Sequence, residues 1–277
     1  NCMTNIFDLT GKIALVTAST QGIGFATAQL LAEEGATVWV HGRGGDNLQH
    51  ALERIRQAVP GAQLHGVAAD LAADDGVARL LAQLPAVDIL VNCYADTGAK
   101  MLADVSAADW DTVLHNNLAP ASAISSHYLA GMLRRDWGRI VFVSSDLALR
   151  PLPFMVPYSA AKMAQLTLAR GLAEMTAGSE VRVNAVLAGL TLTERIESIL
   201  RGTAERNAIP FEKFMHDYFH DPACSHVAAV GHATSLIKRL LQPEEVANLI
   251  VYLCSQLSSG TNGATLRCDG GATLTAI

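Results

Sequence analysis

The feature of this chain that most restricts its fold is a series of short apolar runs that alternate with segments of helical character. The runs are rich in β-branched residues and cover 12–17, 37–41, 63–68, 87–92, 139–144, 181–186 and 264–268. Helical patterns cover 25–34, 47–59, 74–84, 109–118 with a continuation after Pro120 to residue 135, a segment opening at Pro157, and 243–257. Apolar strands that alternate with helices are typical of a parallel sheet covered on both faces. We therefore predict an α/β protein with one doubly wound parallel sheet of about seven strands.

Composition narrows the class of protein further. The chain has 277 residues, 50% of them hydrophobic, and a net charge of −6. We find no linker or repeat and predict one domain over residues 1–277. The absence of a basic stripe argues against nucleic acid and anionic membranes as partners, and no apolar run is long enough to span a membrane. The five scattered cysteines include no Cys-x-x-Cys pair, which favours reduced thiols and a cytoplasmic location.

A glycine-containing turn follows the first predicted strand and opens the first predicted helix. Strand, glycine turn and helix in this order are the setting for a dinucleotide pyrophosphate, because the backbone comes close at glycine and the helix N-terminus offers free N–H groups. A plain turn between a strand and a helix is the alternative. The residues predicted to bind cofactor in this turn are Thr17, Ser19, Thr20, Gln21, Gly22, Ile23 and Gly24.

The end of the second predicted strand reads His41-Gly42-Arg43-Gly44. Nicotinamide-binding folds that use NAD(H) place an acidic residue here to bind the ribose 2′-hydroxyl, whereas a basic residue suits a 2′-phosphate. No acid stands at this strand end, and Arg43 carries a forked, permanently charged guanidinium. We therefore predict NADP(H) in preference to NAD(H).

The segment 158–162 brings an aromatic hydroxyl and an ammonium onto one face of a helix. Tyr158 and Lys162 are four positions apart, a spacing that makes them neighbours on a helix surface. A nearby positive charge favours the phenolate, so we expect Lys162 to lower the pKa of Tyr158. A tyrosine tuned in this way can exchange a proton with a carbonyl or alcohol oxygen.

Taken together, these motifs resemble the short-chain dehydrogenase/reductase family over roughly residues 9–271, which implies a Rossmann-type fold. The cofactor motif Thr-Gly-x-x-x-Gly-x-Gly is matched by Thr17, Ala18, Gly22 and Gly24, where we expect Ala18 to keep the turn with a negative φ. The family's Asn-Asn-Ala-Gly is reduced to Asn92-Cys93-Tyr94-Ala95, and its Pro-Gly to Ala188-Gly189. The terminal Asp-Gly-Gly is matched by 269–271. Further cofactor contacts implied by the resemblance are Asp70, Leu71, Asn92, Tyr158, Lys162, Gly189, Thr191 and Thr193.

The resemblance also implies four catalytic residues. Ser145 lies at the end of the fifth predicted strand, thirteen positions before Tyr158, as the family's serine does. Asn117 matches the family's asparagine in the long helix and would hold a water in a proton relay. Tyr158 would protonate the developing alkoxide and Lys162 would hold the nicotinamide ribose. Ser145 would donate a hydrogen bond to the substrate oxygen. The resemblance thus implies an NADP(H)-dependent oxidoreductase that interconverts a ketone or aldehyde and an alcohol.

Three alternatives remain open at this stage. One is an NAD-dependent alcohol dehydrogenase of the same family, and another is a dinucleotide-binding regulator without turnover. The third is a metalloprotein, because histidine and cysteine ligands recur at four-residue spacing from position 216. We predict no metal, since Asp221-Pro222 should break that helix. The residues of this stretch are His216, His220, Cys224, His226 and His232.

Residues 194–238 break the alternation of strands and helices and contain no clear strand. We interpret them as a mobile substrate flap, because segments above a rigid sheet commonly carry binding residues. Four aromatic residues suggest an apolar lining for it: Phe211, Phe214, Tyr218 and Phe219. Sugar-like alcohols, β-ketoacyl thioesters and hydrophobic ketones all remain possible substrates. The resemblance also implies a homo-oligomer, a dimer or homotetramer, formed through the two long helices that flank the fifth strand.

Overall fold

The computed structural model of the chain describes residues 6–221 and 235–275. It contains a seven-stranded sheet with the order β3-β2-β1-β4-β5-β6-β7, in which every pair of neighbours is parallel. The strands are β1 Ile13–Val16, β2 Thr37–Gly42, β3 Leu64–Ala68, β4 Ile89–Asn92, β5 Gly138–Ser145, β6 Val181–Ala188 and β7 Thr265–Cys268. The predicted α/β architecture of about seven parallel strands is therefore confirmed.

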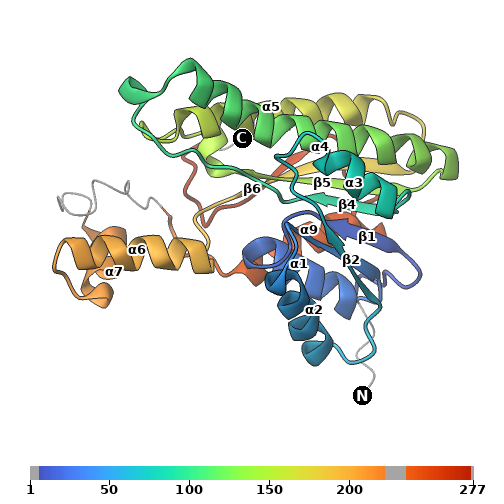
Figure 1. Ribbon diagram of the computed structural model, residues 1–277, viewed down its shortest axis with the longest axis horizontal. Coiled ribbons are helices and arrows are strands. Elements are labelled where there is room, and N and C mark those ends of the chain that lie inside the picture. Colours follow the sequence, from blue (N-terminus) through green and yellow to red (C-terminus); the bar gives the residue numbers. More distant parts are fainter. Residues whose placement is uncertain (1–5, 222–234, 276–277) are drawn as a thin grey trace.

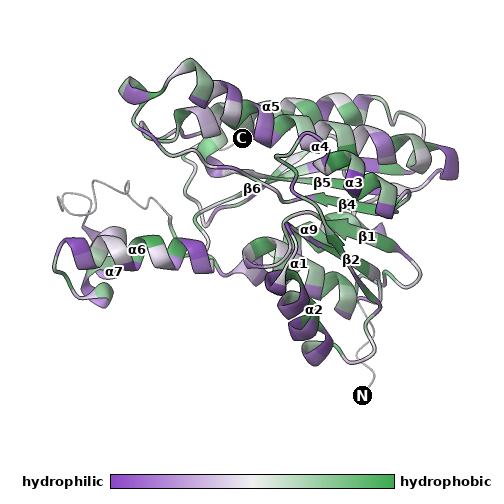
Figure 2. Ribbon diagram, viewed as in Figure 1, coloured by the Kyte–Doolittle hydropathy of each residue, from purple (hydrophilic) through white to green (hydrophobic). Residues whose placement is uncertain are grey.

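Helices cover both faces of the sheet (Figure 1). One face carries α1 Gly22–Glu33, α2 Asp46–Ala58 and α9 Pro243–Cys254, whose buried side chains form one apolar cluster with the strands. The other face carries α3 Gly76–Gln83, α4 Ala107–Arg135 and α5 Val156–Glu174, which form a second cluster. Figure 2 shows the strands green between these layers and the outward side of α2 purple. The periodic apolar positions of each helix thus account for the two layers.

The strand order reverses between β1 and β4, which are neighbours in the sheet although β2 and β3 separate them in the chain. Helices that follow strands on either side of such a point diverge, so a crevice opens at the carboxyl ends of the strands. The turns after both strands meet there, because the Thr17 N–H donates to the carbonyl of Val91 at 3.0 Å. The ends of β5 and β6 lie at the same edge, where Ser145 pairs with Ala188.

The long helix α4 differs from its prediction in being continuous through Pro120. A proline in a helix removes its own N–H, so one i−4 carbonyl, that of Asn116, loses its donor while the helix continues. The helix also begins at Ala107, two residues earlier than expected. Ser106 and Asp109 form a capping box there, in which the Asp109 N–H donates to the Ser106 hydroxyl at 3.2 Å.

The region 194–238 is more regular than its sequence indicates. Its described part contains two helices, α6 Glu194–Arg206 and α7 Phe211–His220, which lie beside the main body in Figure 1. They enclose an apolar cluster of their own, made of Leu200, Ala204, Phe214, Tyr218, Phe219 and Leu240. The pair of helices thus carries its own small core, and a role as substrate flap stays a prediction.

The remaining short elements are the single-turn helices Leu102–Asp104, Asp146–Ala148 and Gln256–Ser258. None of the helices in the described part of the chain is both long and apolar enough to pass through a membrane. The three cysteines within that part, Cys93, Cys254 and Cys268, are free thiols.

Candidate active site

The turn between β1 and α1 is tied to the two neighbouring strands by buried side chains. The Thr17 hydroxyl oxygen accepts from the N–H groups of Cys93 at 2.9 Å and Tyr94 at 3.0 Å, after β4. The Ser19 hydroxyl donates to the Val16 carbonyl at 2.7 Å and accepts from the His41 N–H at 2.9 Å, in β2. Both predicted cofactor residues therefore use their hydroxyls to fix the loop, and their own N–H groups also bond inside the protein, to the carbonyls of Val91 and His41.

The N-terminus of α1 fits a dinucleotide pyrophosphate. Its N-cap residue, Gln21, makes no capping hydrogen bond through its side chain to the described residues, so the N–H groups of Gly22, Ile23 and Gly24 remain available to an anion. Gly22 has φ +57°, and a Cβ on Gly24 would clash with the carbonyl oxygen of Ala18. Glycine is therefore required at both positions, as the predicted role of this turn demands.

Ala18 adopts a positive φ of +51°, so the expectation of a negative value was wrong. A non-glycine residue in this region costs roughly 1–2 kcal/mol. The Ala18 N–H donates to His41 Nδ1 at 2.9 Å, and the opposite ring nitrogen, Nε2, lies 3.1 Å from the carbonyl oxygen of Ala69. This pairing fixes the tautomer of a neutral imidazole, since Nδ1 accepts and Nε2 donates. Burial lowers the pKa of His41 to about 4.

The adenosine end of the predicted cofactor site lies where β2, β3 and β4 end. Arg43 is exposed there, directly after Gly42, and a Cβ on Gly42 would lie 2.6 Å from the Thr20 methyl carbon. Burial raises the pKa of Tyr94, the carboxylates of Asp96 and Asp70 act in the same direction, and Arg43 opposes them. The Arg43 guanidinium is thus close enough to the Tyr94 hydroxyl to influence its pKa, as the Asp70 carboxylate does.

The other two predicted residues at this end are buried. Leu71 is 2% exposed and belongs to the apolar core. The Asn92 side chain donates to the Ser125 hydroxyl at 3.0 Å, which links β4 to α4. Leu71 and Asn92 line a small cavity together with Thr17 and Tyr94.

The nicotinamide end is formed by the segment after β6. Gly189 approaches the C-terminal strand so closely that a Cβ there would lie 2.6 Å from the Asp269 Cα. The Thr191 hydroxyl is buried and donates to the Gly189 carbonyl at 2.9 Å. Thr193 caps α6, and its methyl carbon lies 2.9 Å from where a Cβ on Gly22 would stand. The structure therefore brings Thr193 against the glycine turn, although 171 positions separate it from Gly22 in the chain.

Three of the four predicted catalytic residues meet at the ends of β5 and α5. Ser145 is the last residue of β5. Its hydroxyl donates to Asp146 Oδ1 at 3.2 Å, accepts from the Leu147 N–H at 3.2 Å, and is close enough to the Tyr158 phenol to lower the pKa of that group. The Lys162 Nζ lies 5.6 Å from the centroid of the Tyr158 ring. Proline at the second position of α5 fits the free first turn of a helix, so Tyr158 and Lys162 follow on one face as predicted.

Burial raises the pKa of Tyr158, which is opposite to the expected direction. The hydrogen bond with Ser145 and the charge of Arg195 lower the pKa, while Asp146 and Cys93 raise it further. The Lys162 ammonium, which donates to the Val143 carbonyl at 2.9 Å, does not offset the effect of burial. Without cofactor the phenol therefore keeps its proton at neutral pH.

Lys162 is buried, with 1% of its surface exposed. Burial lowers the pKa of its ammonium to about 8, while the Cys93 thiol acts in the opposite direction. Burial in turn raises the pKa of Cys93 to about 12. Cys93 was noted in the sequence only as a departure from a motif, and the structure places it in the electrostatic surroundings of both Lys162 and Tyr158.

Asn117 is buried in α4, and its side chain is occupied by the chain around it. Its Nδ2 donates to the carbonyls of Asp96 and Val113, both at 2.8 Å, and its Oδ1 accepts from the Asp96 N–H at 3.3 Å. Its main-chain carbonyl accepts from Gln165 Nε2 at 2.8 Å. Gln165 was missed in the sequence. Its position three residues after Lys162, on the buried face of α5, was the available signal.

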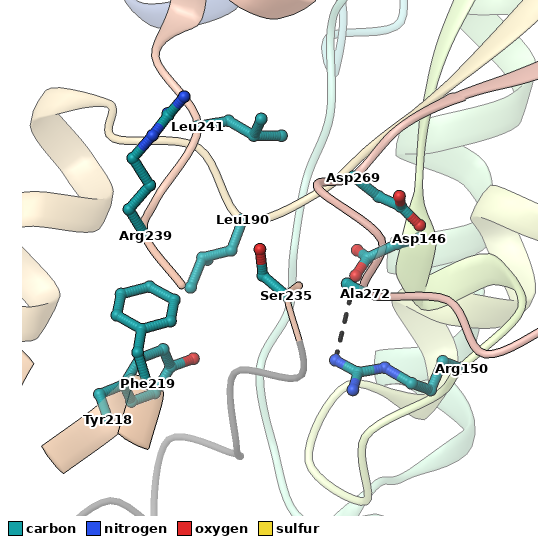
Figure 3. A pocket seen from close by; sticks show the side chains of 10 residues that line it. All are labelled: Asp146, Arg150, Leu190, Tyr218, Phe219, Ser235, Arg239, Leu241, Asp269 and Ala272. Carbon is teal, nitrogen blue, oxygen red and sulfur yellow. Dashed lines mark ion pairs between the residues drawn. The ribbon is translucent and has the colours of Figure 1, made fainter. Parts of the chain in front are cut away.

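A hollow lies between the single-turn helix after β5, α7 and the C-terminal segment, and Asp146, the neighbour of Ser145, is part of its lining (Figure 3). Burial raises the pKa of Asp146, and the Arg150 guanidinium, 4.0 Å away, opposes this. Tyr218 and Phe219 line the hollow and also belong to the apolar cluster of α6 and α7, in which Phe214 is buried and against which Phe211 packs. An apolar lining for substrate stays a prediction. The full lining is Asp146, Arg150, Leu190, Tyr218, Phe219, Ser235, Arg239, Leu241, Asp269 and Ala272.

The histidine-rich stretch is only partly visible. His216 and His220 lie on α7 with their rings stacked, 4.7 Å between centroids. Cys224, His226 and His232 lie outside the described residues. Within 6–221 and 235–275, no three His, Cys, Asp or Glu side chains are arranged to hold a metal ion.

Comparisons with known proteins agree with this geometry. A family model described as short chain dehydrogenase matches residues 12–203. The oxidoreductase YvrD of Bacillus subtilis, described as uncharacterized, is 38% identical over 263 residues, which cover 94% of this chain and 95% of that protein. The 3-oxoacyl-[acyl-carrier-protein] reductase FabG of Aquifex aeolicus is 31% identical over 267 residues, 95% of this chain and 98% of its own.

Among solved structures, L-sorbose reductase from Gluconobacter frateurii, complexed with NADPH and L-sorbose, superposes with a TM-score of 0.87. The match has 26% sequence identity and covers 97% of this chain and 99% of that one.

Proposed function

The chain belongs to the short-chain dehydrogenase/reductase family and is an oxidoreductase of alcohol and carbonyl groups, and we propose that it interconverts a ketone or aldehyde and its alcohol with NADP(H). The observation that carries this proposal is the meeting of the Ser145 and Tyr158 hydroxyls above the buried Lys162. Two hydroxyls on one carbonyl oxygen supply a proton and a hydrogen bond where negative charge develops.

The cofactor, when bound, supplies or accepts the hydride, and the chain supplies binding, orientation and protons. The glycine turn and the free N–H groups of α1 hold the pyrophosphate. Tyr158 donates its phenolic proton to the carbonyl oxygen during reduction, and Ser145 donates a hydrogen bond to the same oxygen. The raised pKa of Tyr158 keeps the phenol protonated at neutral pH, which is the state that reduction needs.

Lys162 has two tasks in this proposal. Its buried ammonium has three N–H donors, two of which bond to described residues of the protein, and the third would bond to the ribose hydroxyls. In the direction of alcohol oxidation Tyr158 acts as the base. The positive charge of Lys162 then stabilises the negatively charged phenolate form of Tyr158.

Tyr158→Phe tests the proposal directly. The variant loses the proton donor and keeps the ring, so turnover of carbonyl substrates with NADPH should fall by at least ~10³-fold. Binding of NADPH, followed by the change in nicotinamide fluorescence, should persist. Tyr252→Phe is the matched control, since Tyr252 lies on α9 on the opposite face of the sheet. Undiminished turnover in Tyr158→Phe excludes the assignment.

Preference for NADP(H) is supported by Arg43 and by the lack of an acid at the end of β2. The superposed L-sorbose reductase was solved with NADPH. Arg43→Ala should weaken NADPH binding about 10–100-fold and leave NADH binding within about twofold, because only the 2′-phosphate needs the guanidinium. Arg56→Ala, on the exposed side of α2, is the control. Equal losses for the two cofactors contradict this preference.

We propose a small polar hydroxy-ketone or its alcohol as substrate. The hollow beside the catalytic hydroxyls is lined by two carboxylates and two guanidiniums, with only two aromatic rings. Such a lining offers hydrogen-bond partners to the hydroxyl groups of a substrate. A long alkyl chain in the hollow would instead remove water from the charged side chains, which costs free energy. A panel of ketoses, β-ketoacyl thioesters and alkyl ketones, compared by kcat/KM, tests this class. Higher kcat/KM for alkyl ketones rejects it.

We also propose a homo-oligomer, a dimer or tetramer. Met163 is 40% exposed on the outer side of α5, next to the long helix α4. Light scattering of the purified protein measures its mass, and a monomer at micromolar concentration rejects this part of the proposal. Met163→Glu should shift the mass downward if α5 forms the contact.

A further inference from the structure

The buried side-chain amide of Gln165 hydrogen bonds to both Lys162 and Asn117. It is 1% exposed and lies on the side of α5 that faces α4. Its Oε1 accepts from the Lys162 ammonium at 3.0 Å, and its Nε2 donates to the main-chain carbonyl of Asn117 at 2.8 Å. A glutamine buried without partners would cost several kcal/mol, so this pairing fixes the amide in one orientation.

The bridge determines where Lys162 points. An ammonium carries three N–H donors. The described residues supply acceptors for two of them, the Val143 carbonyl at 2.9 Å and Gln165 Oε1. The third donor is therefore left for a bound ligand. Because β5 provides one acceptor and the α5–α4 bridge the other, the ammonium is held from two layers of the fold.

The side chain of Asn117 takes no part in this arrangement. Its amide is engaged with Asp96 and Val113, and only its main-chain carbonyl faces Lys162, through Gln165. The family resemblance implies a water at this point, held by the asparagine and linked to the lysine. In this chain an amide side chain makes the same two hydrogen bonds.

We propose that Gln165 is a positioning residue that joins Lys162 directly to the Asn117 main chain in place of a relay water. The direction in which the ammonium points toward the cofactor is then set by the Gln165 side chain, which belongs to the chain itself, rather than by an exchangeable water. The amide in addition closes the path for protons beneath Lys162, because an amide passes on a hydrogen bond but neither gains nor loses a proton near neutral pH.

The proton balance then follows. Each reduction breaks the O–H bond of Tyr158 and forms the O–H bond of the product, so Tyr158 must regain one proton from water. With the path beneath Lys162 closed, that proton enters from the hollow, by way of Asp146, whose carboxylate accepts from the Ser145 hydroxyl at 3.2 Å. This step rests on the proposed function, whereas the bridge itself does not.

The first test needs no turnover. Lysine labelled with ¹³C at Cε is titrated by NMR in the cofactor-free protein, and Lys162→Met identifies the signal. Gln165→Met removes the acceptor and keeps the volume, so the pKa of Lys162 should fall by about one unit. Gln165→Glu places a carboxylate at the same atom and should raise that pKa by a similar amount. The other titratable groups near the ammonium, Cys93 from the segment after β4 and Tyr158 on α5, are the same in all variants.

Shifts of opposite sign support the bridge. No shift in either variant overturns it, and so do two shifts of the same sign. Gln57→Met, an exposed glutamine on α2, controls for the exchange of residue type. Should one variant fail to fold, the other still decides, since each predicts a sign of its own.

The second test compares turnover in Gln165→Met and Gln165→Ala. Alanine leaves a polar space with two partners, Lys162 Nζ and the Asn117 carbonyl, which suits one water. Gln165→Ala should therefore keep kcat within about threefold, whereas Gln165→Met should lose about tenfold with KM for the carbonyl unchanged. In the methionine variant the alkaline limb of the kcat profile should also move to lower pH.

Equal losses in both variants with unmoved pH profiles would mean that Gln165 only fills space, which overturns the inference. A wild-type protein that turns over no carbonyl with NADPH would refute the proposed function instead, and the titration of Lys162 would still decide on the bridge.

Discussion

His41 allows the sharpest prediction about the stability of this protein. Its ring is 2% exposed and holds the cofactor turn by accepting from the Ala18 N–H. Burial lowers its pKa from 6.5 to about 4. A histidine with a depressed pKa in the folded state binds its proton more readily when unfolded, so acid pulls the equilibrium toward unfolding.

The sign and size follow from this difference. Above pH 6.5 the ring is neutral in both states, and its contribution to stability is fully present. Between pH 6.5 and about 4 only the unfolded chain takes up the proton. Each pH unit is worth about 1.4 kcal/mol, so acidification to pH 4 should remove about 3 kcal/mol through this one residue.

The assay is the free energy of unfolding in urea, measured for the wild type and His41→Gln from pH 7 to pH 4. At pH 7 the variant should be less stable by ~1–2 kcal/mol, because it makes the two hydrogen bonds of the ring poorly. As the pH falls the wild type should lose about 3 kcal/mol relative to the variant, which has nothing to titrate at this position, so the two curves should cross and the variant should be the more stable protein at pH 4. Carboxylates elsewhere titrate equally in both proteins and cancel.

His50→Gln, an exposed histidine on α2, is the matched control and should run parallel to the wild type. Parallel curves for His41→Gln would refute the reasoning. So would a pKa near 6.5 for His41, measured directly by NMR.

Three further predictions follow from the site and its support. Ala18→Gly should raise stability by up to about 1 kcal/mol, measured by urea unfolding, because glycine adopts the observed φ of +51° without strain. A drop in stability would show that the loop relaxes around alanine. Gly24→Ala should cost about 2 kcal/mol or more and abolish NADPH binding, since its Cβ meets the Ala18 carbonyl. Binding at wild-type affinity would contradict this. Tyr128→Phe should cost ~1–2 kcal/mol, because the buried hydroxyl donates to the Leu84 carbonyl at 2.6 Å and its loss leaves that acceptor unpaired. An unchanged thermal midpoint would count against it.

The sheet could be predicted from sequence because its signal is local and redundant. Each strand is an apolar run of β-branched residues, and a parallel sheet buried on both faces needs nothing else of them. Two positions in α4 show where local reasoning stops. The capping box at Ser106 is a readable motif that moves the start by two residues. Pro120 reads as an interruption, but packing of the helix against α5 outweighs one lost hydrogen bond.

The helices α6 and α7 could not be predicted with equal ease. Their apolar residues face each other and Leu240 rather than the sheet, so no alternation with strands marks them. A small separate core gives each helix only a few buried positions. The sequence signal is then too short to distinguish a helix pair from a loop rich in aromatic residues.

At the site, residue types could be predicted and electrostatics could not. Spacing places Tyr158 and Lys162 on one helical face, and the structure agrees. The pKa of Tyr158 is raised by burial, which depends on how the rest of the chain packs around the phenol. The position of the lysine nitrogen depends on two acceptors outside the motif, the Val143 carbonyl and the Gln165 amide. A motif of five residues contains neither of them.

The buried neighbours of the cofactor turn allow alanine in place of its first glycine. The hydroxyls of Thr17 and Ser19 and the ring of His41 all bind loop backbone inside the protein. Each such hydrogen bond is worth about 1 kcal/mol, so together they exceed the cost of roughly 1–2 kcal/mol for alanine at positive φ. The shape of the turn is thus imposed by its buried neighbours, whereas contact with the pyrophosphate needs only backbone N–H groups. Side chains at Thr17 and Ser19 should therefore affect NADPH affinity through the stability of the loop. Their alanine variants should lose affinity and thermal stability together.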